Sequence, residues 1–277
     1  MHSIVTADWT EKQLQNETTR IVDCRFELQD PKAGIAAYEK KHITGAVHFD
    51  LEEDLAAPAE EYGGRHPLPD LDILVKKLSA AGIDQETTVI AYDDQGGAMA
   101  ARFWWLLRYL GHQQVHVLGQ PFSLWEKEGR PVDTETPDFA EKFFIADMEP
   151  NMLAHIEEVK LSLHDDETIL IDARDEKRFK GIEDNVDPVA GHIPGAKHYF
   201  WRNVINDKGE WKSKSELQKL FAPLQNESVI SYCGSGVTAA VNILAMSEAG
   251  YDMPRLYAGS WSDWVSYRDL PVEKSEE

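Results

Sequence analysis

The sequence has little cysteine, few basic residues and no long apolar run. Only two of its 277 residues are cysteines, Cys24 and Cys233, which excludes a small scaffold held together by several disulfides. Lys and Arg number 28 against 49 Asp and Glu, giving a formal charge of −21. So acidic a chain repels nucleic acid, whose non-specific binding depends on Lys and Arg replacing counterions. We therefore expect no nucleic-acid partner.

Signals of several other protein classes are also missing. No stretch approaches the roughly 18 consecutive apolar residues of a membrane span, and no basic region followed by an apolar one opens the chain. No His and Cys spacing is typical of a zinc site, and no phosphate loop ends in Gly-Lys-Ser or Gly-Lys-Thr. We expect a cytoplasmic protein with no membrane partner, no metal and no other cofactor.

The first half of the chain is repeated in the second half. Residues 21–25 are similar to 170–174, and 42–46 to 192–196, at offsets of 149 and 150 residues. Later pairs, such as Asp93 with Cys233, are offset by 139 or 140 residues, as expected if one half gained or lost about ten residues. A period this long indicates a duplicated domain, and 277 residues suffice for two domains of roughly 150 residues.

Short aliphatic runs alternate with amphipathic stretches in each half. Residues 89–92 and 229–232 are apolar on both faces, as in the buried strands of a parallel sheet. Residues 98–110 and 237–249 have apolar residues at helical spacing, and a glycine follows each stretch. This alternation predicts an α/β fold with two tandem domains, each a mostly parallel sheet flanked by helices.

Proline and acidic residues interrupt the apolar pattern near residues 134–151, where we expect the two domains to join. We place the first domain at residues 1–135, a linker at 136–150 and the second domain at 151–277. Reactive residues in such sheets lie beyond the carboxyl ends of the strands, often where a helix begins.

Cys233 occupies that kind of position. It follows the predicted strand and opens the loop Gly234-Ser235-Gly236, which leads into a helix. Two glycines let the backbone curl tightly and point successive N–H groups inward, which favours an anion at the centre. A thiol there loses its proton readily, so we expect Cys233 to be a nucleophile. The alternative, a small buried apolar side chain, explains the glycine pattern poorly.

Cys24 is the opposite case. It takes the position of Ala173 in the repeat, at the end of a predicted strand, and no glycine loop follows it. We expect Cys24 to be buried and unreactive.

The segment 233–239 resembles the active-site loop of the two-domain sulfurtransferases of the rhodanese family. Its Gly-Ser-Gly form is similar to that of the 3-mercaptopyruvate branch, whereas thiosulfate-specific members usually carry basic residues after the cysteine. Further similar segments are 172–179, 191–196 and 259–264 in the second half, and 42–46, 104–105 and 111–112 in the first. The resemblance covers nearly the whole chain and implies that only the second domain is catalytic, which agrees with Asp93 at the nucleophile position of the first.

The resemblance implies a sulfur transfer in two steps. The Cys233 thiolate takes a sulfur atom from a small anionic donor and becomes a persulfide. A thiol acceptor, such as a small thiol or a thioredoxin-like protein, or cyanide, then removes that sulfur. The resemblance also implies a Cys–Ser–His arrangement of Cys233, Ser235 and His66, with His66 reaching the site across the domain interface.

A small carboxylate donor requires fixed positive charge at the site. Arg178 is our choice for binding it, because a planar guanidinium suits a carboxylate, and a structural salt bridge is the alternative role. We expect the loop residues Gly234, Gly236, Val237 and Thr238 to bind the donor as well. Arg174 is expected to pair with Asp172 or a similar acid.

The donor itself is less firmly indicated. Mercaptopyruvate enzymes typically carry a second arginine in the insertion before the segment matching 191–196, and residues 183–190 contain none. Thiosulfate therefore stays open as the alternative donor.

Two other functional classes fit the sequence less well. A related cysteine phosphatase needs an arginine six residues after the cysteine, and Ala239 is at that position. A non-catalytic binding module of the same fold would be expected to lack the nucleophile, which this chain retains as Cys233.

Overall fold

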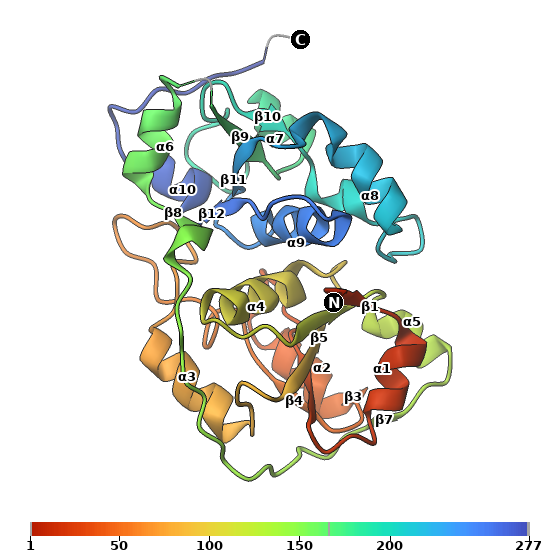
Figure 1. Cartoon of the computed structure of the whole chain (residues 1–277). Helices are drawn as coiled ribbons and strands as arrows, with labels where there is room; N and C mark the ends of the chain where they lie inside the picture. The colour runs from red at the N-terminus through yellow and green to blue at the C-terminus, as the bar shows by residue number, and fades with distance from the viewer. Residues whose placement is uncertain (1, 166, 276–277) are drawn as a thin grey trace. The chain divides into compact units, whose positions relative to one another are not determined.

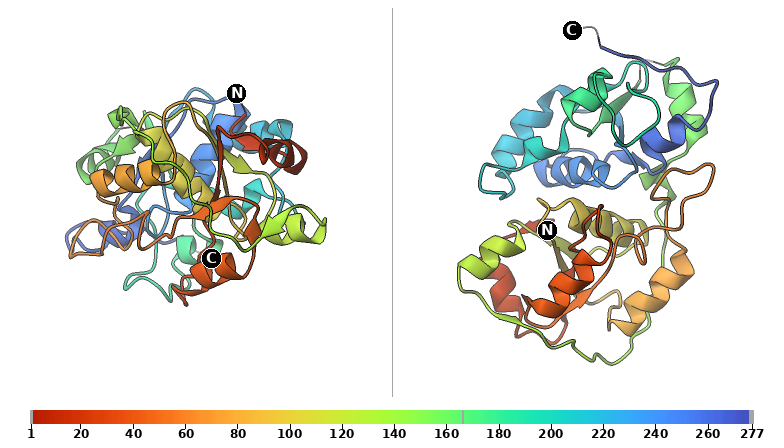
Figure 2. Two further views of the ribbon diagram at one scale, coloured as in Figure 1. Left: turned by 90° about the horizontal axis from the view of Figure 1, so that it is seen from below. Right: turned by 180° about the vertical axis from the view of Figure 1, so that it is seen from behind.

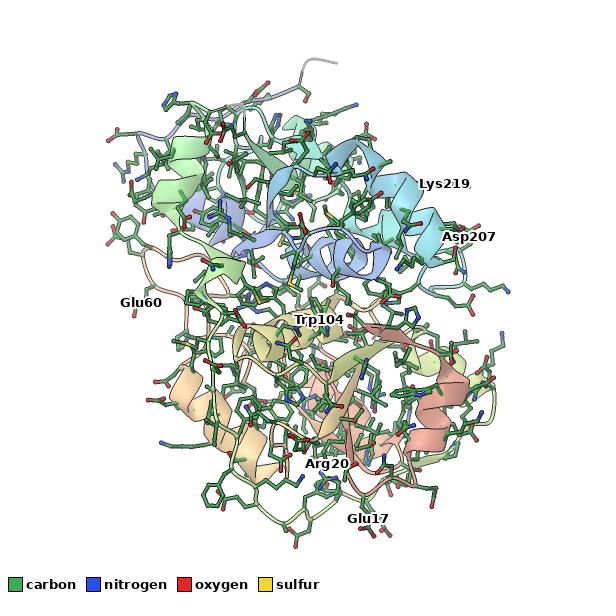
Figure 3. All side chains as sticks on the ribbon, in the orientation of Figure 1. Glu17, Arg20, Glu60, Trp104, Asp207 and Lys219 are labelled. Carbon is green, nitrogen blue, oxygen red and sulfur yellow. The ribbon has the colours of Figure 1, made fainter. Side chains whose placement is uncertain are left out.

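The computed structural model describes residues 2–165 and 167–275, which form two compact units. Unit 1 comprises Met1–Ala57, Leu68–Glu149 and Ile205–Trp211. Unit 2 comprises Pro58–Pro67, Pro150–Val204 and Lys212–Glu277. The segment Pro58–Pro67, in which Figure 3 labels Glu60, thus belongs to unit 2 although it precedes most of unit 1 in the sequence. The limits 1–135, 136–150 and 151–277 remain a prediction about domain organisation.

A five-stranded parallel sheet forms the centre of unit 1. Its strand order is β1-β6-β5-β2-β4. The strands are β1 (Ile4–Val5), β2 (Thr19–Asp23), β4 (Ala46–His48), β5 (Thr88–Tyr92) and β6 (Val115–Leu118). A short antiparallel pair joins β3 (His42–Ile43) to β7 (Val132–Asp133). The helices are α1 (Ala7–Gln13), α2 (Ala33–Lys40), α3 (Leu71–Ala80), α4 (Ala98–Tyr109) and α5 (Phe122–Lys127), and they flank the sheet (Figure 1).

Unit 2 repeats this sheet strand for strand. Its order is β10-β9-β11-β12-β8, again all parallel. The strands are β8 (Leu153–Ala154), β9 (Thr168–Asp172), β10 (Lys197–His198), β11 (Ser228–Tyr232) and β12 (Arg255–Tyr257). The helices are α6 (Ile156–Ser162), α7 (Glu176–Lys180), α8 (Lys214–Phe221), α9 (Ala239–Ala249) and α10 (Ser260–Trp264), with short 3₁₀ turns η1 (Pro150–Met152), η2 (Trp201–Val204) and η3 (Ala222–Leu224) (Figure 2). Two parallel α/β sheets flanked by helices confirm the predicted fold class.

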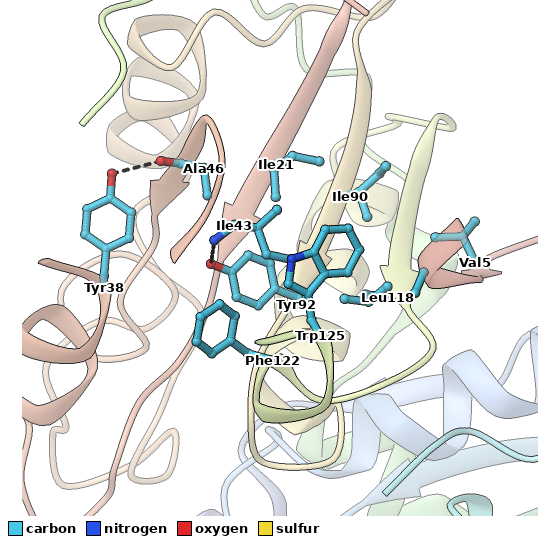
Figure 4. Close-up of a cluster of buried hydrophobic side chains, with 11 residues drawn as sticks. Val5, Ile21, Tyr38, Ile43, Ala46, Ile90, Tyr92, Leu118, Phe122 and Trp125 are labelled. Carbon is cyan, nitrogen blue, oxygen red and sulfur yellow. Dashed lines mark hydrogen bonds between the residues drawn. The ribbon is translucent and has the colours of Figure 1, made fainter. Parts of the chain in front are cut away.

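The cores of the two units have aromatic residues at equivalent positions. In unit 1, Tyr92 packs with Phe122 and Trp125, and its hydroxyl accepts the N–H of Ile43 at 3.1 Å (Figure 4). In unit 2, Tyr232 packs with Trp261 and Trp264 and accepts the N–H of Ile193 at 3.2 Å. Five tryptophans are completely buried, namely Trp104, Trp105, Trp125, Trp261 and Trp264.

Glycines end the two long helices as predicted. Gly111 follows α4 and Gly250 caps α9, with φ of 85° and 89°, a backbone conformation that favours glycine. The helix predicted over 237–249 begins at Ala239 instead, because Gly236 has φ of 75° and keeps the chain in a loop. Among the described residues, no helix combines the length and apolarity needed to cross a membrane.

Candidate active site

Cys233 lies directly after β11, at the carboxyl end of the central strand of the unit 2 sheet. Three hydrogen bonds join its loop to the start of α10. The Cys233 N–H donates to Ser260 Oγ at 3.1 Å, and the Cys233 carbonyl accepts the Trp261 N–H at 3.0 Å. The Gly234 carbonyl accepts the Ser262 N–H, also at 3.0 Å. These bonds fix the backbone of the predicted nucleophile, whose side chain is buried with 2% of its surface exposed.

The equivalent loop of unit 1 shows where an anion binds in this backbone conformation. Asp93 follows β5, and its two carboxylate oxygens together accept four backbone N–H groups. The donors are Gln95, Gly97, Met99 and Ala100, at 2.8–3.0 Å. Burial raises the pKa of Asp93, while these N–H groups partly lower it. A strand followed by this loop therefore surrounds a negative group with converging amides.

The Cys233 loop has the matching N–H groups without the carboxylate. Ser235, Val237 and Ala239 are the counterparts of Gln95, Gly97 and Met99. Among the described residues, no oxygen accepts the N–H of Ser235, Val237 or Ala239. A negative group carried by Cys233, a thiolate or a persulfide, has the chemistry to bind there.

Gly236 allows the loop to pack closely against the rest of unit 2. A Cβ atom at this position would overlap the carbonyl oxygen of Ala258, and φ of 75° disfavours other residues. Val237 is buried beside it and Thr238 is half-buried. These two residues line the loop at the start of α9.

Ser235 and His66 are brought together, as predicted. Ser235 Oγ and His66 Nδ1 are 2.8 Å apart and hydrogen-bonded, and each residue is only 7% exposed. Both residues belong to unit 2, because the segment Pro58–Pro67 is part of that unit, which corrects the expectation that His66 reaches the site across the domain interface. A hydroxyl paired with an imidazole can move a proton, which is the chemical capacity this pair adds to the Cys233 loop.

The segment that carries His66 is anchored to α10. The Gly63 N–H donates to Asp263 Oδ1 at 2.8 Å, and the Arg65 N–H donates to Ser262 Oγ at 3.1 Å. Gly64 lies so close to the main chain of α10 that a Cβ atom would overlap the Gly259 carbonyl oxygen. Helix α10 therefore holds both the Cys233 loop and the His66 segment.

Arg178 lies beside the Cys233 loop, and it also forms ion pairs. It is on α7, and its backbone N–H donates to the carboxylate of Asp175, which caps the helix. A Cβ atom on Gly234 would be 3.2 Å from Arg178 Nη2, so the guanidinium faces the residue next to Cys233. Arg178 Nη2 is also 2.6 Å from Asp187 Oδ2, and Nε is 3.2 Å from Asp184 Oδ2. The salt-bridge role of Arg178 is therefore present, and its role in binding the donor stays a prediction.

Sequence reasoning missed Arg65 and Asp187, which belong to the same group of ion pairs as Arg178. Arg65 Nη2 would be 3.0 Å from a Cβ on Gly234, and Arg65 Nη1 forms an ion pair with Asp187 Oδ1. Arg65 could have been suspected, because it directly precedes His66 in the sequence. Asp187 lies in the insertion 183–190, where only the missing arginine had attracted notice.

Comparison with known proteins identifies the family of the chain. The family model of the rhodanese-like domain matches residues 6–128 and again residues 155–267. The chain belongs to the rhodanese family. Over 97% of its length it is 38% identical to a probable 3-mercaptopyruvate sulfurtransferase of Pseudomonas aeruginosa, 97% of which is covered.

Other rhodanese-family proteins are similar over comparable lengths. A putative thiosulfate sulfurtransferase of Mycobacterium tuberculosis is 34% identical, with 91% of this chain and 89% of the relative covered. The crystal structure of a 3-mercaptopyruvate sulfurtransferase of Escherichia coli superposes with a TM-score of 0.81 at 30% identity, covering 95% of this chain and 100% of the other. The prediction of a tandem rhodanese-domain sulfurtransferase is confirmed.

The remaining predicted residues of this rhodanese-family chain are structural. Arg174 forms a buried ion pair with Asp172 at 2.6 Å, which with Asp184 nearby raises the pKa of Arg174 despite its burial. Cys24 is completely buried, and burial first, then Asp23, Asp93 and Asp54, raises the pKa of its thiol well above the ordinary range. No group of three or more His, Cys, Asp or Glu side chains in the described part of the chain is arranged to hold a metal ion.

Proposed function

We propose that this rhodanese-family sulfurtransferase moves a sulfane sulfur from 3-mercaptopyruvate, through a persulfide on Cys233, to a thiol or cyanide acceptor. The similarity to proteins named as 3-mercaptopyruvate sulfurtransferases in P. aeruginosa and E. coli supports the donor. The observation that carries the proposal is the hydrogen bond of 2.8 Å between Ser235 Oγ and His66 Nδ1 in the loop of Cys233.

In the first step, the Cys233 thiolate attacks the donor sulfur. A sulfur–sulfur bond forms as the carbon–sulfur bond breaks, and its electron pair passes to carbon to give the enolate of pyruvate. The amides of Ser235, Val237 and Ala239 stabilise the negative charge on the Cys233 sulfur before and after this step. The enolate must take up one proton to leave as pyruvate, so a proton donor next to it accelerates the reaction.

The Ser235–His66 pair supplies that proton. His66 holds Ser235 in place through the hydrogen bond to its hydroxyl, and a proton passing from the imidazole to Ser235 replaces the one that Ser235 gives to the enolate. In the second step, an acceptor thiolate or cyanide attacks the outer sulfur of the persulfide. The sulfur–sulfur bond breaks and its electrons return to Cys233, which regenerates the thiolate.

Thiosulfate is the alternative donor, and its reaction differs from that of mercaptopyruvate in a way that can be measured. Attack on the outer sulfur of thiosulfate releases sulfite, so no carbon has to be protonated. Ser235→Ala should therefore slow turnover of mercaptopyruvate by about 10²-fold or more and turnover of thiosulfate far less. His66→Gln should do the same, and the double variant should be no slower than the slower single one.

Initial rates with each donor and cyanide, measured on the full chain, test the proposal. A wild-type preference for mercaptopyruvate together with the donor-selective effect of Ser235→Ala is the expected result. Preference for thiosulfate, or equal slowing of both donors by Ser235→Ala, would overturn the mercaptopyruvate proposal in favour of the thiosulfate reaction.

A further inference from the structure

The main chain at Arg65 is held in place next to the Cys233 loop. Its N–H is bonded to Ser262 Oγ at 3.1 Å, Gly64 before it is packed against α10, and His66 after it is bonded to Ser235. The side chain of Arg65 is 32% exposed, so its guanidinium is accessible to a small molecule. A cation held in this way needs little reorganisation to bind an anion.

Arg65 and Arg178 converge on the same residue. Arg65 Nη2 and Arg178 Nη2 would lie 3.0 and 3.2 Å from a Cβ atom on Gly234. Because Gly234 has no side chain, both guanidinium groups reach the residue that directly follows Cys233. The two cations come from separate parts of the sequence, the Pro58–Pro67 segment and α7.

Asp187 holds the two guanidiniums together. Its Oδ1 pairs with Arg65 Nη1 and its Oδ2 lies 2.6 Å from Arg178 Nη2, while its own side chain is 1% exposed. Like charges placed this close repel each other, and a carboxylate between them offsets the repulsion. Asp187 uses one nitrogen of each arginine. Within the described residues, Arg65 has no other side-chain partner.

We propose that Arg65 and Arg178 together bind the carboxylate of the sulfur donor, and that Asp187 is the positioning residue that aligns them. Guanidinium N–H groups suit the oxygens of a carboxylate, and Arg65 Nη2 and Arg178 Nη1, which the aspartates leave unused, would hold a three-carbon acid at Gly234 with its sulfur toward Cys233. Arg65 thus supplies the second cation that the insertion 183–190 does not provide. This inference rests on the proposed function, because it assumes a donor with a carboxylate.

Kinetics of an Arg65→Met variant test the inference against a matched control. Loss of a charge-assisted hydrogen bond should raise the KM for mercaptopyruvate by about tenfold to a hundredfold. Arg65→Lys should recover part of that loss, because an ammonium keeps the charge without the fork. The control is Arg255→Met, which removes another arginine of unit 2 that is 28% exposed and paired with Glu158. Its KM should stay within about twofold of wild type.

Pyruvate provides a readout that does not depend on sulfur transfer. Calorimetric titration should show that pyruvate binds Arg65→Met weaker by about the same factor as the change in KM, and binds Arg255→Met as wild type does. If Arg65 only anchors the His66 segment, Arg65→Met should instead lower kcat and leave pyruvate binding unchanged, which would overturn the inference.

The titration also separates this inference from the proposed function. A wild-type protein that binds pyruvate through Arg65 but does not turn over mercaptopyruvate would contradict the proposed donor and support the carboxylate site. A wild-type protein that turns over mercaptopyruvate with the same KM and the same pyruvate affinity in Arg65→Met would contradict only the role of Arg65.

Discussion

Asp93 follows β5 of unit 1 directly, at the position that Cys233 occupies after β11 of unit 2. The Asp93 carboxylate accepts the N–H groups of Gln95, Gly97 and Met99, whose counterparts Ser235, Val237 and Ala239 after Cys233 have no acceptor among the described residues. The two loops therefore occupy equivalent positions, and the loop of unit 1 binds a carboxylate of its own chain. Unit 1 therefore carries a carboxylate bonded to its own backbone at the position where unit 2 carries the thiol of Cys233.

Because four hydrogen bonds hold Asp93, its replacement should lower the stability of the protein without directly changing sulfur transfer at Cys233. Asp93→Asn removes the charge and turns an amide NH₂ toward backbone donors, so it should lower the free energy of unfolding by roughly 3 kcal/mol. Chemical denaturation measures this change. Asp94→Asn is the control, since Asp94 is exposed and its amide variant can still accept the N–H of Ser123. An equal stability for the two variants would contradict the role given to Asp93.

Replacement of Ser260 should slow persulfide formation to the same extent with either sulfur donor. Its hydroxyl accepts the Cys233 N–H at 3.1 Å and donates to the Tyr257 carbonyl at 2.8 Å, and it is completely buried. Ser260→Ala leaves two buried groups unpaired and should destabilise the protein by about 1–3 kcal/mol. Because the loop backbone loosens, persulfide formation should slow equally with mercaptopyruvate and thiosulfate.

The control for Ser260 is Ser266→Ala, which removes a hydroxyl bonded to the Asp263 carbonyl away from the Cys233 loop. The rates of persulfide formation with mercaptopyruvate and with thiosulfate should both stay near the wild-type values in Ser266→Ala. Donor-selective slowing by Ser260→Ala would instead assign this residue to proton transfer and not to positioning.

Asp187 predicts a change of donor preference. Arg65, Arg174 and Arg178 are balanced by Asp172, Asp184 and Asp187, so this group carries no net charge. Asp187→Asn leaves one positive charge in excess, and a dianion gains more from that charge than a monoanion does. The ratio of kcat/KM for thiosulfate to that for mercaptopyruvate should therefore rise by about tenfold. An unchanged or lower ratio would contradict the proposed position of the donor's charge.

His112 predicts how stability depends on acidity. The residue is completely buried, and burial lowers the pKa of its imidazole from 6.5 to about 4. The neutral ring is favoured in the folded state, so this contribution to stability is fully present above pH 6.5 and is lost as the pH falls toward 4. A shift of this size corresponds to about 3 kcal/mol.

Urea unfolding between pH 7.5 and 4.5 tests the role of His112. The variant His112→Leu should lose stability less steeply with acidification than wild type does. His164→Gln, which alters an exposed histidine, should follow the wild-type curve. Parallel curves for wild type and His112→Leu would refute the lowered pKa.

Local patterns were enough to predict the sheets and the nucleophile loop. Strands β5 and β11 are apolar on both faces because both faces of a parallel sheet are covered, so their sequences indicate their burial. Gly236 is recognisable because a tight loop before a helix needs positive φ. The burial of Cys24 follows in the same way from the absence of such a loop.

The cationic part of the site could not be predicted from local patterns. Arg65 and Asp187 are 122 residues apart, and neither lies in a strand or helix whose periodicity would indicate its direction. Their contact depends on the placement of the Pro58–Pro67 segment in unit 2, which is determined by hydrogen bonds to α10. Arg178 could be identified as a candidate, but its two aspartate partners could not.

Mass spectrometry of the protein after incubation with mercaptopyruvate tests the central claim most directly, since the chain has two cysteines to compare. The account predicts one additional sulfur atom on the peptide that contains Cys233 and none on the peptide that contains the buried Cys24. Cys233→Ser should abolish the added sulfur and the turnover, and Cys24→Ser should preserve both. Sulfur found on Cys24, or full turnover by Cys233→Ser, would contradict the account.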